Sequence, residues 1–486
     1  MECGAQYIFE SPEQFWAELQ EIISISPTSS LDQLDYALRN YVVFASTYMD
    51  DFLSAPGSFD QALFALLDSP LFTSHPDRMT ANLISLITPS TSPSTLFVVL
   101  MLILHLGLAN PLVSSRNLTH ALPGGLHASA KVFKALRKRW GDVVGVLMEC
   151  VVHAGVVEGA QGTGNVGEQQ RMMPSDGWEE RVGTAATVVL YEVCRVQRLD
   201  PAELAVFSFE FISHLFALVE RTRDAEDETF NYSLIKLIIA LNEQFMVSSL
   251  PAPTPGQGSL PPPILPTIVG KRKVERDPNL VLEVLKGREG DSKTFGENII
   301  FILNRSNGSP DSLCVSLLIL KLLYLLFTTS GTHEYFYTND LCVLVDVFIR
   351  ELCDLGPESE GVRSYSFLPF LFTGQLKQVS HLSQLKHTYL RVLHPLLTNT
   401  QLRHHPYKRP LLRRVLNSLV SQSAYSQTDA TTRRLVERNL RGTWCEGLTD
   451  DSIGEGEKRA VTRNGIVGES GEERATMGLG WSSGMG

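Results

Sequence analysis

The sequence lacks the cysteine patterns that hold metals or form disulfide frameworks. Its 486 residues include an odd number of cysteines, without any C-x-x-C pair, at Cys3, Cys150, Cys194, Cys314, Cys342, Cys353 and Cys445. Most of them stand in apolar, helix-like surroundings, where a free cysteine behaves as a small hydrophobic residue. The adjacent His404 and His405 have no zinc-type partners at suitable spacing. We therefore expect a reducing, cytoplasmic environment and no metal site.

Motifs of enzyme active sites are also missing. The sequence contains no G-x-S-x-G, no H-E-x-x-H, no Walker A motif and no paired catalytic carboxylates. One G-x-G-x-x-G occurs, at Gly162, Gly164 and Gly167, but it lies inside a polar, Gly-rich stretch. A dinucleotide site needs this motif between a strand and a helix. We therefore expect no nucleotide, no other cofactor and no enzymatic activity.

The alternation of polar and apolar residues that marks β-strands is absent, and helical spacing dominates. Apolar residues recur at i, i+3 and i+4 through most of the chain. This pattern predicts helices at residues 15–23, 31–53, 59–72, 95–109, 128–152, 184–197, 202–221, 229–246, 278–286, 296–304, 312–328, 339–353, 379–397, 407–422 and 429–440. Pro201 is well placed to begin one of them, because its missing N–H costs nothing in the first turn. The chain is predicted to be all-α.

Two apolar runs fall short of a membrane span. His105, Asn110 and Pro111 interrupt the run at residues 96–113, and Lys321 interrupts the run at residues 317–327. A span needs about 20 consecutive apolar residues. The opening MECGAQYIFESPEQ has no basic segment of the signal-peptide type, so we expect neither a signal peptide nor a transmembrane segment. Helices that are apolar on every side instead indicate burial within a stack of helices.

Successive helices with short connections predict an armadillo/HEAT-like α-solenoid with degenerate repeats, since no fixed period is visible. Composition divides it into acidic helical repeats at 1–154, a Gly-rich inserted loop at 155–182 and further repeats at 183–246. A Pro-rich loop at 247–276, leucine-rich repeats at 277–441 and a disordered Gly- and Glu-rich tail at 442–486 follow.

Charge is unevenly distributed along the chain. The net charge of −11 makes free nucleic acid an unsuitable partner. Residues 1–110 hold twelve acidic and two basic side chains, whereas residues 403–441 hold nine basic and two acidic ones. Such a gradient can orient a protein partner or self-association, and it is equally consistent with solvated helix faces.

Three polar residues near the middle of the C-terminal half are candidates for capping or binding. Thr338, Asn339 or Asp340 can cap the helix that follows them by accepting its free N–H groups, and the alternative is direct contact with a partner.

A second candidate is a basic run near the C-terminal end of the helical region. The basic residues Lys408, Arg409, Arg413 and Arg414 share a predicted helix with an apolar face made of Leu411, Leu412, Val415, Leu416 and Leu419. These charges either meet an acidic partner surface or are solvated. The aromatic cluster Tyr335, Phe336 and Tyr337 is expected to pack a corner between helices.

The Pro-rich loop contains LPPPILP at residues 260–266, followed by Lys271, Arg272 and Lys273. Extended proline runs dock in the aromatic grooves of SH3 domains. The basic residues lie too far from the prolines for a well-oriented SH3 ligand. A stiff solvated loop is the competing interpretation.

Five segments together resemble the leucine-rich domain of the WISH/DIP/SPIN proteins, which include the animal Nck-interacting protein with an SH3 domain and fungal cortical-patch relatives. They are FNYSLIKLIIALNEQF (230–245), GENIIFILNR (296–305), LILKLLYLLFTTSGTHEYFYTNDLCVLVDVFIREL (318–352), LRVLHPLL (390–397) and YKRPLLRRVLNSL (407–419). The resemblance covers about residues 184–441. Residues 1–60 depart from it, because they have the pattern of acidic helices where some members carry an SH3 domain.

The resemblance implies a function as well as a fold. Members of this family have an armadillo-like helical domain that activates the actin-related protein 2/3 complex without a pre-existing filament. The product is a linear actin filament that can seed branched growth, in fungi at cortical, endocytic actin patches. It therefore implies a non-enzymatic regulator whose partners are this complex, the pointed end of an actin filament and SH3-domain proteins. The runner-up is an α-solenoid scaffold that recruits SH3-domain proteins through the Pro-rich loop.

Overall fold

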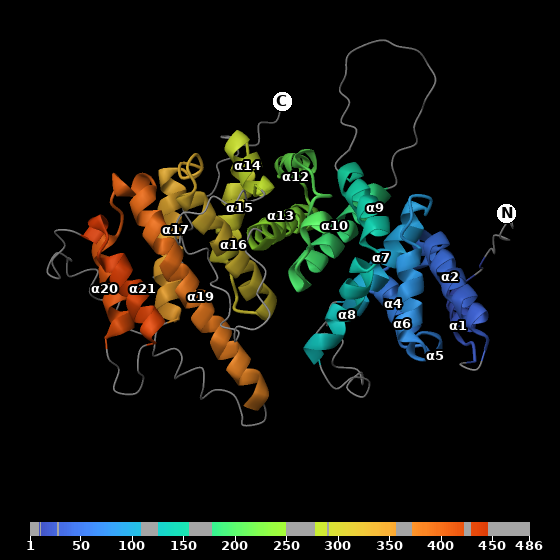
Figure 1. Cartoon of the computed structure of the whole chain (residues 1–486). Helices are drawn as coiled ribbons and strands as arrows, with labels where there is room; N and C mark the ends of the chain where they lie inside the picture. Colours follow the sequence, from blue (N-terminus) through green and yellow to red (C-terminus); the bar gives the residue numbers. More distant parts are fainter. Residues whose placement is uncertain are drawn as a thin grey trace, which may run out of the picture. The chain divides into compact units, whose positions relative to one another are not determined.

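The computed structural model describes residues 9, 11–26, 29–107, 125–154, 177–248, 278–288, 291–355, 372–421 and 429–445. Every regular element within these ranges is a helix, which confirms the all-α prediction for the described part of the chain (Figure 1). The chain divides into two compact units, Met1–Leu326 and Phe327–Gly486. The predicted inserted loops lie largely outside the described ranges, as do the G-x-G-x-x-G motif, the LPPPILP run and most of the tail.

The first half of unit 1 contains nine helices in the described residues. They are α1 (Pro12–Ile23), α2 (Leu31–Thr47), α3 (Met49–Phe52), α4 (Ser58–Leu67), α5 (Pro70–Thr73), α6 (Pro76–Ser85), α7 (Pro93–Gly107), α8 (Gly125–Arg137) and α9 (Trp140–His153). Capping residues and prolines determine where several of these helices begin. Ser30 and Gln33 form a reciprocal capping box before α2, and a proline occupies the first position of α1, α5 and α6.

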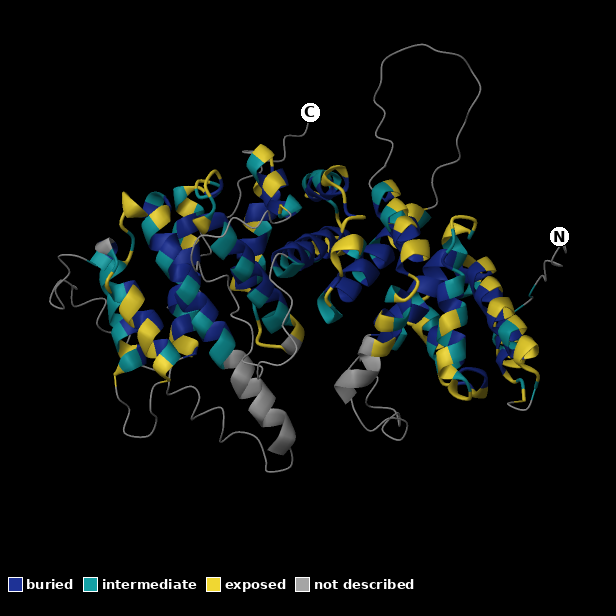
Figure 2. Ribbon diagram, viewed as in Figure 1, coloured by how far each residue is buried: buried dark blue, intermediate teal, exposed yellow. Residues whose placement is uncertain are grey.

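The second half of unit 1 begins with a long helix that is largely buried. Its described helices are α10 (Trp178–Val196), α11 (Pro201–Leu204), α12 (Phe209–Arg221), α13 (Thr229–Ser248), α14 (Leu280–Gly287), α15 (Lys293–Asn304) and α16 (Pro310–Thr328), of which α16 extends just past the unit boundary. Helix α10 packs against α7, α8, α9 and α13. Pro201 begins α11, as predicted. Figure 2 shows the buried residues of α7, α10 and α13 in dark blue.

Two glycines allow the central helices of unit 1 to approach closely. A Cβ on Gly183 of α10 would lie 2.1 Å from the Cβ of Ala154, directly after α9. A Cβ on Gly107 at the end of α7 would lie 2.3 Å from ring atoms of Phe133 in α8. No side chain larger than hydrogen fits at either position without movement of its neighbour.

Helix α16 contains the apolar run at residues 317–327. By length and composition, Asp311–Thr328 is the one segment of the described residues that could cross a membrane. In the structure Ile319, Leu320, Leu322 and Leu323 are fully buried. Lys321 forms an ion pair with Glu243 of α13, with 2.5 Å between Nζ and Oε1. These contacts favour a core helix, in line with the interpretation of this run from the sequence.

Unit 2 is built around the long helix α19. Its helices in the described residues are α17 (Thr338–Asp354), α19 (Phe372–Asn399), η3 (Gln401–Arg403), α20 (Arg409–Val420), α21 (Ala430–Leu440) and η4 (Thr443–Cys445). Helix α19 packs on α17, η3 and α21, and α20 packs on α17 and α21. Phe348 and Tyr389 are fully buried, and their rings meet edge to face at 5.0 Å between centroids.

The structure divides four of the predicted helices in two and adds one that was not predicted. The helix predicted at 31–53 is α2 and α3, and the helix predicted at 59–72 is α4 and α5. The helix predicted at 128–152 is two helices, because the chain turns between α8 and α9 and thereby buries Trp140. The helix predicted at 202–221 is also two, α11 and α12. Helix α6 was not predicted, because it is mostly polar and buries only Met79, Leu83 and Ile84.

Candidate partner-binding surface

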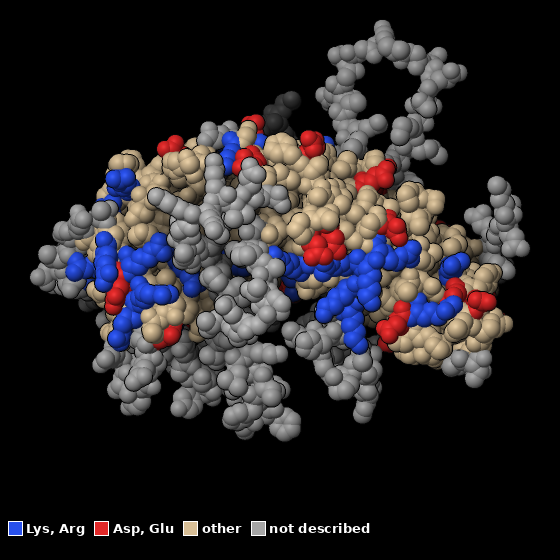
Figure 3. Space-filling model, in the orientation of Figure 1, with Lys and Arg blue, Asp and Glu red and all other residues tan. Residues whose placement is uncertain are grey.

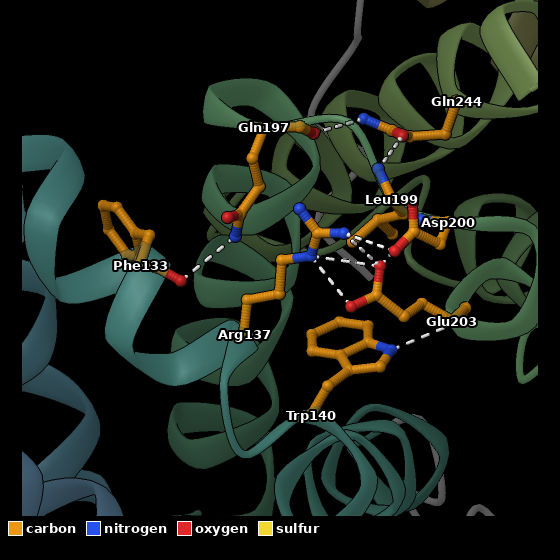
Figure 4. A network of polar contacts seen from close by, with 8 residues as sticks. All are labelled: Phe133, Arg137, Trp140, Gln197, Leu199, Asp200, Glu203 and Gln244. Carbon is orange, nitrogen blue, oxygen red and sulfur yellow. Dashed lines mark hydrogen bonds and ion pairs between the residues drawn. The ribbon is translucent and has the colours of Figure 1, made fainter. Parts of the chain in front are cut away.

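A polar network holds together four segments of unit 1 (Figure 4). The guanidinium of Arg137, at the end of α8, donates to both carboxylate oxygens of Glu203 at 2.7–3.0 Å and to Asp200 at 3.1 Å. The Trp140 indole N–H donates to the Glu203 carbonyl oxygen at 3.2 Å. Within the same turn, Glu203 accepts the backbone N–H of Asp200 at 2.7 Å. The two-pronged Arg137–Glu203 contact fixes the orientation of both side chains.

The network continues through two glutamines. Gln197, directly after α10, donates to the carbonyl oxygen of Phe133 in α8 at 3.0 Å. Gln244 of α13 accepts the Leu199 N–H at 2.9 Å and donates to the Gln197 carbonyl oxygen at 2.8 Å. These bonds satisfy backbone groups that the end of α10 leaves without helical partners. The network therefore connects α8, α10 and α11 to α13.

The capping candidates Thr338, Asn339 and Asp340 lie at the start of α17. Asp340 accepts the backbone N–H of Tyr337, the residue before the helix, at 3.3 Å. The Thr338 hydroxyl donates to the side chain of Gln401 in η3, and Asn339 is exposed. Asp340 thus engages the helix start, whereas Thr338 connects α17 to the turn before α20.

The neighbouring aromatic residues divide between core and surface. Phe336 is buried, and its ring lies 4.9 Å from that of Tyr335 and 5.9 Å from that of Phe327. The Tyr337 side chain, in contrast, is 59% exposed. This corner between helices therefore leaves one large aromatic ring exposed at the surface.

The structure brings the basic run Lys408, Arg409, Arg413 and Arg414 next to α17. Lys408 Nζ contacts Asp346 Oδ1 of α17 at 2.9 Å, and the Tyr407 hydroxyl donates to Asp346 Oδ2 at 3.0 Å. Burial disfavours the charged amine of Lys408, but its bonds to Asp346 and Tyr407 outweigh this and raise its pKa. Helix α17 and the start of the basic run therefore lie side by side.

The four basic side chains differ in their exposure to solvent. Arg409 is half-buried and donates to the carbonyl oxygens of Leu402 and Arg403 at 3.2 and 3.1 Å. Arg413 is half-buried and hydrogen-bonds the side chain of Cys445, and Arg414 is also half-buried. Only Lys408 is exposed, and it is paired with Asp346. The opposite face holds the buried Leu412, Val415, Leu416 and Leu419, with Leu411 half-buried.

A more open basic face lies on α21. Its buried positions Thr432, Leu435, Val436 and Asn439 recur with helical spacing, and this leaves Arg433, Arg434 and Arg438 exposed, followed by Arg441. Figure 3 shows basic side chains in blue over the α20–α21 region. Among the described contacts only Arg441 has an acidic partner, Glu437 at 3.6 Å. The sequence signal was the same helical spacing of apolar residues that located the face of α20.

The described residues contain no group of three or more His, Cys, Asp or Glu side chains arranged to hold a metal ion. The chemistry on this surface is that of ion pairing and aromatic contact, which are the interactions of a protein-binding surface.

Comparison with known families finds a match for the middle part of the chain. Residues 227–412 match the family model described as the SPIN90/Ldb17 leucine-rich domain. The matched segment begins two residues before α13 and ends within α20. This part of the chain matches the SPIN90/Ldb17 leucine-rich domain, and the resemblance to the WISH/DIP/SPIN family is confirmed.

Three fungal proteins are similar to the chain. Protein dip1 of Schizosaccharomyces pombe is 33% identical over 265 residues, which cover 54% of this chain and 58% of the relative. Protein LDB17 of Saccharomyces cerevisiae is 26% identical over 49% of this chain and 39% of the relative. Protein LDB17 of Eremothecium gossypii is 23% identical over 74% of this chain and 68% of the relative. The chain thus spans less than two thirds of the first two relatives.

Proposed function

We propose that this protein binds the actin-related protein 2/3 complex and activates it without a pre-existing filament, so that linear actin filaments form. The observation that carries the proposal is the SPIN90/Ldb17 leucine-rich domain at residues 227–412, because the family it resembles is characterised by this activity. The protein then acts in the cytoplasm, at cortical and endocytic actin patches, as a binding regulator and not as an enzyme.

Activation of this kind needs preferential binding to one conformation of the partner. A ligand shifts a conformational equilibrium only by the difference between its affinities for the two states. We propose an armadillo/HEAT-like platform that fits the active arrangement of the complex better than the inactive one. Networks such as Arg137–Glu203 and Gln244–Leu199 support this role, because a preorganised surface loses little conformational entropy on binding.

The contact face is proposed to include α21 and the corner around Tyr337, both in unit 2. Arg433, Arg434 and Arg438 supply exposed positive charge, and Tyr337 supplies an exposed aromatic ring. Both kinds of residue are enriched where protein interfaces derive their binding energy. The partner surface is accordingly expected to be acidic, and the approach of the two proteins to depend on salt.

Direct binding tests this proposal. The purified chain and the purified actin-related protein 2/3 complex are mixed and separated by size-exclusion chromatography. The chain is expected to elute with the complex. Separate elution at micromolar concentrations of both proteins, with the chain folded, would exclude the proposal.

The scaffold alternative rests on the LPPPILP run at residues 260–266, which lies outside the described residues. Deletion of residues 250–266 separates the two functions. An SH3 scaffold would lose its SH3-domain partners after the deletion, whereas the proposed activator keeps both its binding to the complex and its stimulation of actin assembly.

A further inference from the structure

A pocket in unit 1 is lined by residues to which the proposed function assigns no role. It is open to solvent, has a volume of about 690 Å³, and is bounded by α13, α15, the loop after α15 and the first turns of α16. Its floor is apolar, because Ile235 and Val315 line it and are buried. Most of the other lining residues are polar or charged, so the pocket can contact a ligand that has both an apolar and a polar group.

Two aromatic rings stand exposed at this pocket. The side chain of Tyr232 is 42% exposed and that of Phe301 is 49% exposed, although both belong to helices with well-buried opposite faces. The Arg305 guanidinium lies over the Phe301 ring at 4.6 Å from its centroid. Exposed aromatic and arginine side chains around an apolar floor provide contact area for a large apolar group.

The pocket also contains an amine without an ion-pair partner. Lys236 of α13 is half-buried, and its Nζ lies 4.4 Å from the ring centroid of Tyr191 and 5.3 Å from that of Tyr232. Within the described part of the chain it forms no ion pair. The neighbouring Glu192 is already engaged with Arg195 at 2.6 Å. Burial lowers the pKa of Lys236, and the negative charges of Glu192 and Asp311 oppose this effect only in part.

The remaining charges at the pocket are more exposed than Lys236. Arg223 pairs with Glu297 at 3.8 Å, and both side chains are 55% exposed. Glu228 and Asp311 are also exposed. Water and salt screen such charges strongly, whereas a half-buried amine gains much more from an opposite charge brought into contact with it. The pocket therefore favours an anionic group at its floor despite the acidic residues at its edge.

We propose that this pocket binds a short peptide segment of a partner protein in which a large apolar side chain is followed by a carboxylate. The apolar side chain lies between Tyr232 and Phe301 on the floor, and the carboxylate pairs with Lys236. Asn298 is half-buried in the lining and its amide nitrogen donates to Asn231 at 3.2 Å, so its side-chain oxygen is the group that accepts a hydrogen bond from the peptide backbone. This inference does not depend on the proposed function, because no feature of the pocket requires the actin-related complex.

Three synthetic peptides test the proposal by isothermal titration against the full chain. The first is acetyl-Gly-Leu-Trp-Glu-Glu-Gly-amide, the second replaces both glutamates with glutamine, and the third replaces Leu-Trp with Ala-Ala. The first is expected to bind at least about tenfold more tightly than either of the others, because each control lacks one of the two contacts. Equal binding of all three peptides, or no binding of the first at millimolar concentration, overturns the proposal.

Matched variants then locate the site. Lys236→Met keeps the aliphatic stem of the side chain and removes its charge, so it is expected to abolish the preference for the acidic peptide. Phe301→Ser is expected to weaken binding of both peptides that contain Leu-Trp. Lys131→Met and Phe209→Ser alter an exposed lysine and an exposed phenylalanine outside the pocket and should change nothing. If Lys236→Met remains folded by circular dichroism and binds as the unaltered protein does, the assignment of the pocket is wrong.

Discussion

The guanidinium of Arg137 holds two carboxylates that follow it by 63 and 66 residues in the chain. The pair Arg137–Glu203 is mostly shielded from water, with side-chain exposures of 26% and 22%. The hydrogen bonds from Arg137 lower the pKa of Glu203 from its ordinary value of 4.5, and they outweigh the opposing effect of burial. A lowered carboxyl pKa in the folded state makes stability depend on pH.

We predict that Glu203→Gln destabilises the protein by about 1–2 kcal/mol near pH 7, since it removes a charge-assisted hydrogen-bond pair. The stabilisation from an ionised Glu203 is complete above the unfolded pKa and disappears as pH falls through the folded pKa. The difference between variant and unaltered protein should therefore shrink as pH falls below 4.5. Urea unfolding followed by tryptophan fluorescence measures it at pH 7 and at an acidic pH below 4.5.

Glu226→Gln is the matched control, because Glu226 is exposed and has no ion pair among the described residues. It should have almost no effect at either pH. A loss of stability for Glu203→Gln that persists unchanged at low pH would show that the effect is one of packing and not of charge.

At the scale of single elements, the strength of the apolar spacing decided which helices could be predicted from the sequence. Long helices with strong apolar spacing, such as α13 and α17, were predicted to within a few residues of their observed bounds. Helix α6 was missed because its few apolar positions are separated by polar residues. The break between α8 and α9 was also missed, because it depends on Trp140 reaching Glu203, a contact across 63 residues that local spacing does not encode.

Local spacing also failed to predict the contacts of the basic run on α20. Helical spacing was enough to place Leu412, Val415, Leu416 and Leu419 on the buried face. It could not show that Arg409 turns toward backbone carbonyl groups or that Arg413 meets Cys445. Those contacts come from segments that the tertiary fold brings alongside the helix, and they change which cations a partner can reach.

The close approach of α9 and α10 gives a prediction at the scale of elements. Gly183→Val places methyl groups where Ala154 already lies, so we expect a destabilisation of about 1–3 kcal/mol and a lower melting temperature. Gly145→Ala in α9 is the control, because a Cβ there meets no atom within 4 Å. It should be neutral or stabilise by about 0.5–1 kcal/mol, since alanine is the better helix former. Equal effects of both changes in differential scanning calorimetry would contradict the packing model.

At the scale of the whole molecule, the acidic segment at residues 1–110 belongs to one unit and the basic segment at residues 403–441 to the other. The overall charge of −11 conceals this division. The structure refines the basic part, because α21 presents its arginines to solvent more openly than α20 does. A partner that recognises this protein by charge is therefore expected to contact α21.

We predict that the combined change Arg433→Glu, Arg434→Glu and Arg438→Glu weakens binding to the actin-related protein 2/3 complex about tenfold or more, and that the effect shrinks at high salt. Biolayer interferometry at two salt concentrations measures this. The control reverses the exposed lysines Lys131, Lys134 and Lys138 of unit 1 and should leave the affinity nearly unchanged. If the control weakens binding as much as the α21 variant does, the attraction comes from overall charge and the proposed face is wrong.

The central claim, activation without a pre-existing filament, is tested most directly by fluorescence microscopy of single actin filaments. Purified actin and actin-related protein 2/3 complex are imaged with and without this protein, in the absence of preformed filaments. The account predicts many more filaments when the protein is present, each starting as a linear filament and not as a branch. An unchanged number of filaments, or new filaments that arise only from the sides of existing ones, would contradict it.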